Sequence, residues 1–133
     1  MRTIIAGSRT ITDYALVERA MEAARDQGIV PTAIISGGAK GVDTLGQRWA
    51  KEHGLPCERF LAEWTRLGKA AGIIRNVRMA YEADALVAVW DGNSAGTRHM
   101  IAVAMKERLP IHVKTVAYVP SPPQDGWPPK VGL

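Results

Sequence analysis

The chain has 133 residues, of which 47% are hydrophobic and 23% are charged. This size and composition are ordinary for one globular domain with its own core, and the chain is too short for two domains. The net charge of +4 favours an anionic ligand, but Lys and Arg alternate with Asp and Glu, so the sequence lacks the basic stripe that nucleic-acid-binding proteins carry.

Short apolar runs alternate with helical patterns along the chain. In chain order, the predicted strands are 3–6, 32–35, 56–61, 85–90 and 111–113, and the predicted helices lie between them, at about 13–28, 41–54, 68–82 and 97–108. Asp13 is a suitable cap for the first helix, and Gly28 ends it. This alternation predicts an α/β fold, a single Rossmann-like domain with a mostly parallel sheet of about five strands flanked by helices.

Each helical pattern also predicts which side chains face the core. The expected inward stripes are Tyr14, Val17, Met21 and Ala24 in the first helix, Leu45, Gly46 and Trp49 in the second, and Ala70, Ile74, Val77 and Tyr81 in the third. On that third helix the stripe leaves Arg75 and Arg78 facing outward, toward either solvent or a ligand.

The C-terminal segment differs in composition from the rest of the chain. We expect residues 1–114 to form the ligand-binding domain and residues 115–133 to form a tail, extended or disordered because it holds five prolines, Pro120, Pro122, Pro123, Pro128 and Pro129. Alternatively, Tyr118 and Trp127 dock on a partner subunit.

Several classes of site are excluded or disfavoured. The lone cysteine, Cys57, excludes an internal disulfide and an all-cysteine zinc site, and we expect it to be a small buried residue at the start of a strand. The three histidines, His53, His99 and His112, stand at no metal-ligand spacing, so neither a metal nor another cofactor is predicted. No apolar stretch is long enough for a signal peptide or a membrane span, which predicts a cytoplasmic protein without a membrane partner.

The turn 36–43 joins a strand to a helix and is the strongest candidate for a phosphate site. Its three glycines remove Cβ atoms where the backbone turns sharply or approaches a ligand, and the helix after it offers N–H groups and a partial positive charge. The spacing is neither that of a P-loop nor Gly-x-Gly-x-x-Gly. The alternative is a tight turn that needs glycine for its backbone alone.

Two further turns end at the same edge of the predicted sheet, where ligands of such folds bind. After the first strand, Gly7, Ser8 and Arg9 offer a hydroxyl and a guanidinium, and the alternative is an arginine that faces solvent. The turn 91–97 opens a helix with Ser94 and Thr97, or else is only a capped loop.

The predicted ligand site combines these turns with residues before and on the third helix. There Trp64 either stacks on a base or caps the core. The expected ligand-binding residues are Gly7, Ser8, Arg9, Ser36, Gly37, Gly38, Ala39, Lys40, Gly41, Asp43, Trp64, Arg75, Asn76, Met79, Asp91, Gly92, Asn93, Ser94, Gly96 and Thr97.

Six segments together resemble the small YspA-like branch of the SLOG superfamily. They are Ile-Ala-Gly-Ser-Arg (5–9), Ser-Gly-Gly-Ala-Lys-Gly-Val-Asp (36–43), Glu-Trp (63–64), Gly-Lys-Ala-Ala-Gly (68–72), Arg-Asn-x-x-Met (75–79) and Ala-Asp-Ala-Leu-Val-Ala (83–88), and the resemblance spans about residues 1–113. The superfamily also includes the LOG phosphoribohydrolases, which cleave nucleoside monophosphates, DNA-processing protein A, and sensor domains for signals made from NAD.

The resemblance implies a Rossmann-like fold and a nucleotide-derived ligand. It implies that Gly38, Ala39, Gly41 and Asp43 line the ligand and that the turn with Gly92, Ser94, Gly96 and Thr97 holds its phosphate. Members of this branch are often phage-encoded, and relatives in the superfamily commonly form oligomers through helices beside the site. Trp49, Trp64 and Trp127 supply anchors for such an interface.

One departure from the LOG pattern bears on catalysis. LOG enzymes carry a glutamate that assists glycosidic cleavage, and Met100 occupies that position here. Methionine can neither accept a proton nor stabilise an oxocarbenium-like charge. If the chain is an enzyme, the residues left for catalysis are Arg75, Arg78, Asp43 and Asp91.

The sequence therefore predicts a protein that binds, and in a phage context sequesters, a nucleotide-derived molecule such as ADP-ribose or a cyclic ADP-ribose isomer. A counter-defence role in the host cytoplasm rests on the family resemblance alone. The alternatives are a LOG-type nucleotide N-glycosidase and a DNA-processing accessory, and sparse aromatic residues disfavour the latter.

Overall fold

The five strands form one parallel sheet in the computed structural model, which describes residues 1–117. The strands are β1 (Arg2–Gly7), β2 (Ala33–Ser36), β3 (Cys57–Arg59), β4 (Ala85–Trp90) and β5 (Ile111–Thr115), in the order β3-β2-β1-β4-β5. Every neighbouring pair is parallel, so the predicted α/β class and parallel sheet are confirmed. The predicted tail, 115–133, begins with the last residue of β5, Thr115, and Tyr118, Trp127 and the five prolines lie outside the described residues.

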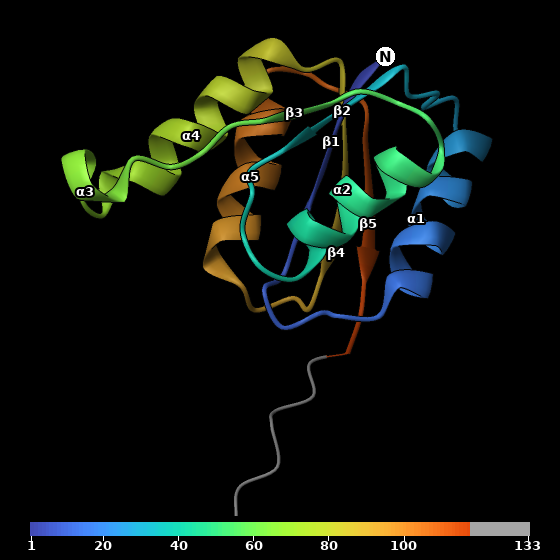
Figure 1. Cartoon of the computed structure of the whole chain (residues 1–133), viewed down its shortest axis with the longest axis horizontal. Coiled ribbons are helices and arrows are strands. Elements are labelled where there is room, and N and C mark those ends of the chain that lie inside the picture. Colours follow the sequence, from blue (N-terminus) through green and yellow to red (C-terminus); the bar gives the residue numbers. More distant parts are fainter. Residues whose placement is uncertain (118–133) are drawn as a thin grey trace, which may run out of the picture.

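Helices cover both faces of this sheet (Figure 1). They are α1 (Tyr14–Asp26), α2 (Val42–Glu52), the short α3 (Trp64–Leu67), α4 (Ala70–Glu82) and α5 (Ala95–Lys106). One core cluster joins α1 and α2 to the sheet, and a second joins α4 and α5 to its other face. As predicted, Asp13 caps α1, and its carboxylate accepts a hydrogen bond from the Ala15 N–H at 3.0 Å.

The prediction that Cys57 is buried is wrong. Cys57 is exposed because β3 is a short strand at the edge of the sheet, paired with β2 and exposed along its length. Trp49 faces the core, as the stripe of α2 predicts, and at only 9% exposed it is not available as the predicted anchor for a partner. The third strand was predicted over 56–61 and has only three residues in the structure, Cys57–Arg59, at the edge of the sheet.

The predicted inward stripe of α4 faces solvent instead. Ile74, Val77 and Tyr81 are exposed, whereas Ala71, Asn76, Met79 and Ala80 are buried. Met79 and Ala80 pack into the second core cluster, and the predicted stripe lies on the other side of the helix. The helical period identified an apolar stripe correctly, but periodicity does not say what that stripe packs against.

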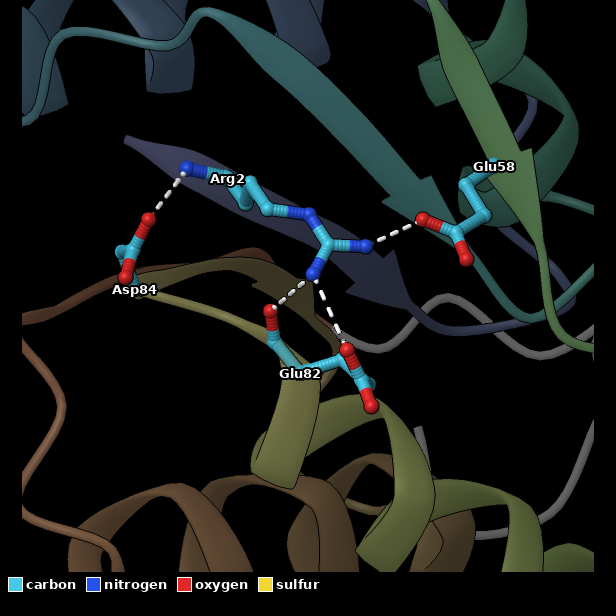
Figure 2. Close-up of polar contacts among 4 residues, drawn as sticks. All are labelled: Arg2, Glu58, Glu82 and Asp84. Atoms are coloured by element: carbon cyan, nitrogen blue, oxygen red, sulfur yellow. Dashed lines mark hydrogen bonds and ion pairs between the residues drawn. The ribbon is translucent and has the colours of Figure 1, made fainter.

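Arg2 fastens the amino ends of the strands to the end of α4 (Figure 2). Its guanidinium forms an ion pair with Glu58 on β3. It also donates to the backbone oxygen of Glu82 at 2.7 Å and to the carboxylate of Glu82 at 3.1 Å, and the Arg2 N–H donates to Asp84 at 2.8 Å. This network lies at the edge of the sheet opposite the glycine-rich turns.

Candidate functional site

An inner pocket lies beyond the carboxyl ends of β1, β2 and β4. Parallel α/β sheets bind ligands at this edge, where connections from neighbouring strands diverge to opposite faces, as those after β1 and β4 do here. The pocket has a volume of about 160 Å³, and its lining is drawn from the β1 end, the 36–43 turn, α4 and the start of α5: Ala6, Gly7, Arg9, Ala39, Asp43, Arg75, Asn76, Met79, Ser94, Gly96, Thr97 and Met100.

A wider outer pocket adjoins the inner one. It has a volume of about 410 Å³ and is lined by Arg9, Gly37, Gly38, Ala39, Lys40, Leu61, Ala62, Trp64 and Arg75. Arg9, Ala39 and Arg75 line both pockets, so these three residues separate one composite cleft into two parts. Three of the outer lining residues are cationic and none is acidic, which suits an anionic ligand.

Gly37 lies between the only acidic residue of the inner pocket and one of its arginines. A Cβ atom at this glycine would lie 2.9 Å from the Asp43 Oδ2 atom and 3.0 Å from the Arg75 guanidinium carbon. The Gly37 carbonyl accepts a hydrogen bond from Arg75 Nη1 at 3.1 Å. Because Gly37 has no side chain, the Asp43 carboxylate and the Arg75 guanidinium can both lie beside this turn. The sequence predicted this glycine for phosphate binding and did not predict these two neighbours.

Asp43 is a buried carboxyl, only 5% exposed, in the first turn of α2. Its Oδ2 atom accepts the Ala39 N–H at 3.1 Å. Burial raises the pKa of Asp43 above its usual value, while the Ala39 N–H and the charges of Arg75 and Arg9 act in the opposite direction. Asp43 is thus a titratable side chain beside the inner pocket, and its position in α2 and its hydrogen bond to Ala39 fix it there.

Asn76 joins α4 to the start of α5. It is 3% exposed, and its Nδ2 donates to the Gly96 carbonyl at 3.3 Å and lies 3.0 Å from His99 Nδ1. Its Oδ1 accepts a hydrogen bond from Arg75 Nε at 3.4 Å. Because the arginine can only donate, the amide nitrogen faces His99, whose Nδ1 must then be the acceptor.

The turn after β4 is organised by Asp91 rather than by its glycines. One oxygen of Asp91 accepts the N–H groups of Asn93 and Ser94, both at 2.8 Å, and these bonds lower the pKa of Asp91 below its usual value. Ser94, Gly96 and Thr97 then present the start of α5 to the inner pocket. A helix N-terminus in this position favours an anion.

Most of the predicted ligand-binding residues converge on the two pockets, but six have other positions. Ser8 and Ser36 are fully buried, and their hydroxyls accept the N–H groups of Asp91 and Gly38 respectively. Gly41 has φ +74° and lies against the backbone of Ser8 and Arg9. Asp91, Gly92 and Asn93 form the turn outside the pocket lining.

The four residues proposed for catalysis divide in the same way. Asp43 and Arg75 line the inner pocket, whereas Asp91 is engaged by its own turn. Arg78 lies over the ring of Phe60 at 5.6 Å and lines neither pocket. Met100, the residue at the LOG glutamate position, lines the inner pocket and is 1% exposed.

Sequence reasoning missed residues that only tertiary structure brings to the site. Ala6, Leu61 and Ala62 line the pockets, and His99 lines neither pocket but forms a hydrogen bond with Asn76. The signal for Leu61 and Ala62 was available, because Leu61 ends the third predicted strand, 56–61, and Ala62 follows it, so both lie at its carboxyl end. No sequence pattern pairs His99 with Asn76.

The fold and the cleft together define a Rossmann-like α/β protein with an anion-favouring pocket at the carboxyl edge of its sheet. Residues 1–67 match the YspA, cpYpsA-related SLOG family. The Gene 61 protein of Mycobacterium phage D29 is 34% identical over 116 residues, which cover 83% of this chain and 93% of that protein. The chain belongs to the YspA, cpYpsA-related SLOG family, as the six sequence segments predicted.

Solved structures, membrane-spanning helices and metal-ligand clusters add no further assignment. No solved structure matches the chain. Among residues 1–117, no helix has the length and apolar character to span a membrane, and no three His, Cys, Asp or Glu side chains are grouped for a metal ion.

Proposed function

We propose that this protein binds a nucleotide-derived small molecule in the composite cleft. The observation that carries the proposal is the inner pocket, where Arg9, Arg75 and the start of α5 converge on one cavity. In proteins, phosphate is usually bound by guanidinium groups and by helix N-termini. We place the phosphate of the ligand between these three features.

The rest of the ligand then extends into the outer pocket. Trp64 is 51% exposed at this pocket and offers an aromatic face for a base. Asp43, beside the phosphate, is suited to a sugar hydroxyl, because a carboxylate accepts two such bonds. ADP-ribose and cyclic ADP-ribose isomers contain all three parts and are our first candidates.

Capture is the favoured outcome, because the position of the LOG glutamate is occupied by a methionine. Met100 lines the pocket and supplies no proton-transfer group. A phage protein of this family that holds a signal intact in the host cytoplasm would withdraw it from host sensors. We also propose that the protein acts as a homo-oligomer.

Hydrolysis of an N-glycosidic bond is the second candidate, and Asp43 is the observation that favours it. A carboxyl with a raised pKa beside an arginine is the kind of group that protonates a leaving base or activates water. In that reaction the bond from C1′ to the base nitrogen breaks, water adds its oxygen to C1′, and the free base carries away a proton.

One experiment distinguishes the two functions. The purified protein is incubated with ADP-ribose, its cyclic isomers and AMP, then denatured, and the released molecules are identified by mass spectrometry. Capture predicts intact ligand in stoichiometric amount, whereas hydrolysis predicts free base that accumulates with time.

Arg75→Ala tests the site itself, with Arg19→Ala on the exposed surface of α1 as the matched control. Loss of a charged hydrogen bond to phosphate costs about 1.5–3 kcal/mol, so we expect about 10- to 100-fold weaker binding for Arg75→Ala alone. Equal affinity in both variants would overturn the site.

A further inference from the structure

Asp43 is the only acidic residue in the lining of the inner pocket, and it shares that lining with two arginines, Arg9 and Arg75. The pocket is small, at about 160 Å³, which is about five times the volume that one molecule occupies in liquid water. An anion inside it therefore lies next to the Asp43 carboxyl. Two negative charges this close, in a pocket partly removed from solvent, repel each other more strongly than they do in water.

Arg9 and Arg75 also offset the charge of Asp43 itself. Burial raises the pKa of Asp43, whereas the charges of these two arginines, together with backbone N–H groups, act to lower it. Asp43 Oδ2 and the Arg75 guanidinium carbon lie 2.9 and 3.0 Å from the same point, the position of a Cβ at Gly37. Within residues 1–117, however, Asp43 forms no ion pair, so neither arginine is committed to it.

An anion in the inner pocket changes this balance in one direction. It attracts Arg9 and Arg75 to itself and adds negative charge beside the carboxylate, and both effects favour the neutral form of Asp43. We propose that Asp43 takes up a proton when phosphate enters the inner pocket and then donates a hydrogen bond to that phosphate. This inference rests on the proposed function, which places the phosphate in this pocket.

The surroundings of the carboxyl suit this role. Asp43 Oδ2 accepts the Ala39 N–H at 3.1 Å, so this oxygen stays an acceptor and Oδ1 carries the proton. An ionised carboxylate can only accept hydrogen bonds, whereas a protonated one has an O–H donor and keeps acceptor capacity for a sugar hydroxyl. Met79 and Met100, each 1% exposed, form an apolar part of the lining, so water screens the charges there poorly.

The other charged groups around this carboxyl come from several elements. Arg9 follows β1 and Arg75 belongs to α4, and arginine stays charged at any ordinary pH. The lining residues from α5 are uncharged, and the titratable His99 on that helix lies outside the lining. Lys40 lines the outer pocket. A pH dependence of anion binding must therefore be tested for an origin in His99 as well as in the carboxyl.

Calorimetric titration of the full chain with sulfate and with ADP-ribose tests the proposal. Both probes keep a constant charge from about pH 6 to about pH 9, a range between the ordinary values for carboxyls and lysines. Proton uptake predicts an affinity that falls by up to about tenfold for each unit of rising pH. At one pH, the heats of binding in Tris and in PIPES should differ by the heat of transferring about one proton from the buffer.

Three variants assign the proton. Asp43→Asn removes the titratable group and keeps a donor, and its affinity is expected to be independent of pH, with equal heats in the two buffers. Asp26→Asn, on the exposed end of α1, is the matched control and should keep the wild-type pH dependence. His99→Asn should keep the same dependence on pH, whatever its absolute affinity.

Infrared difference spectra provide a direct readout. Adding sulfate to the wild-type protein should produce the C=O stretching band of a protonated carboxyl, and Asp43→Asn should lack this band. A probe that binds with the same affinity across the pH range, or a pH dependence that survives in Asp43→Asn, would overturn proton uptake alone. Failure of both probes to bind at any pH would overturn the proposed anion site as well, so the two failures are distinguishable.

Discussion

Arg75 donates a hydrogen bond from Nη1 to the carbonyl oxygen of Gly37 at 3.1 Å, which joins α4 to the turn after β2. Through Nε the same guanidinium contacts Asn76, which in turn bonds to the start of α5. Arg75 and Asn76 together thereby connect the turns of two strands across the inner pocket. We therefore expect a single substitution in this network to affect more than the residue replaced.

Gly37→Ala is expected to damage the site more than the fold. Its φ is not positive, so the backbone accepts alanine, but the new Cβ would push Asp43 and Arg75 apart. We expect ligand affinity to fall at least about tenfold with a small change in the free energy of unfolding, measured by calorimetric titration and chemical denaturation.

Gly38→Ala is the matched contrast. Its φ is +72°, a conformation that L residues rarely adopt, so alanine would strain the backbone there, and its Cβ would also displace the end of the Leu61 side chain, 2.7 Å away. We expect a loss of stability of about 1 kcal/mol or more. A Gly38 substitution is therefore a poor test of binding alone, and a stable Gly38→Ala protein would contradict the geometry of this turn.

Asp43→Asn should stabilise the protein at neutral pH. Burial raises the pKa of Asp43 in the folded state above its value in the unfolded chain. At a pH above the raised pKa the ionised carboxylate therefore opposes folding. This penalty falls as the pH drops through the folded-state pKa and is gone below the unfolded-state pKa. Asn lacks the charge and can still accept the Ala39 N–H. The stability difference between the two proteins should therefore be largest near neutral pH and shrink in acid.

Thermal denaturation across this pH range measures the effect, with Asp26→Asn on the exposed end of α1 as control. If the wild-type protein is more stable than Asp43→Asn at neutral pH, the attraction of Arg9 and Arg75 for the ionised carboxylate outweighs the cost of burying it. If the protein is a hydrolase, the same substitution is expected to abolish turnover.

His99→Leu is expected to weaken ligand binding, although His99 lines neither pocket. The substitution removes the acceptor for Asn76, which leaves a buried N–H unsatisfied and frees Arg75 to move. We expect a cost of about 1 kcal/mol in stability and several-fold weaker binding. His99→Asn, which restores an acceptor near the Nδ1 position, should recover much of both, and no difference between the two variants would contradict the positioning role.

Arg2→Ala should separate stability from function. It removes ion pairs and hydrogen bonds to β3 and α4 at the edge remote from the cleft (Figure 2). Because the Arg2 side chain is 35% exposed, solvent screens these contacts, and we expect a loss of about 1–2 kcal/mol in chemical denaturation. Ligand affinity should stay unchanged, and a loss of affinity would mean that the two edges of the sheet are coupled.

The elements of the fold were predictable because apolar runs and helical periods reflect local geometry. β4 matches its predicted bounds, and Asp13 caps α1 as expected. The side on which α4 is buried was not predictable, since Ile74 and Val77 are as hydrophobic as any core residue. What decides is which side of α4 meets the sheet and α5, and the helical period of one segment does not specify this.

The site was predictable at the level of its turns and not of its individual roles. The three turns after β1, β2 and β4 do meet at one edge, as predicted. Ser8 and Ser36 nevertheless point into the protein, where their hydroxyls satisfy backbone N–H groups. Serine serves phosphate binding and turn capping equally well, so only the structure distinguishes the two uses.

The placement of β1 in the sheet has a consequence for how the chain acquires its fold. Thr3 pairs with Ile34 on one side and with Ala85 on the other. During synthesis β2 leaves the ribosome well before β4, so one edge of β1 waits unpaired while most of the chain is made. We expect docking of β4 to be the slow step of folding, because closing that long loop costs entropy before its contacts form.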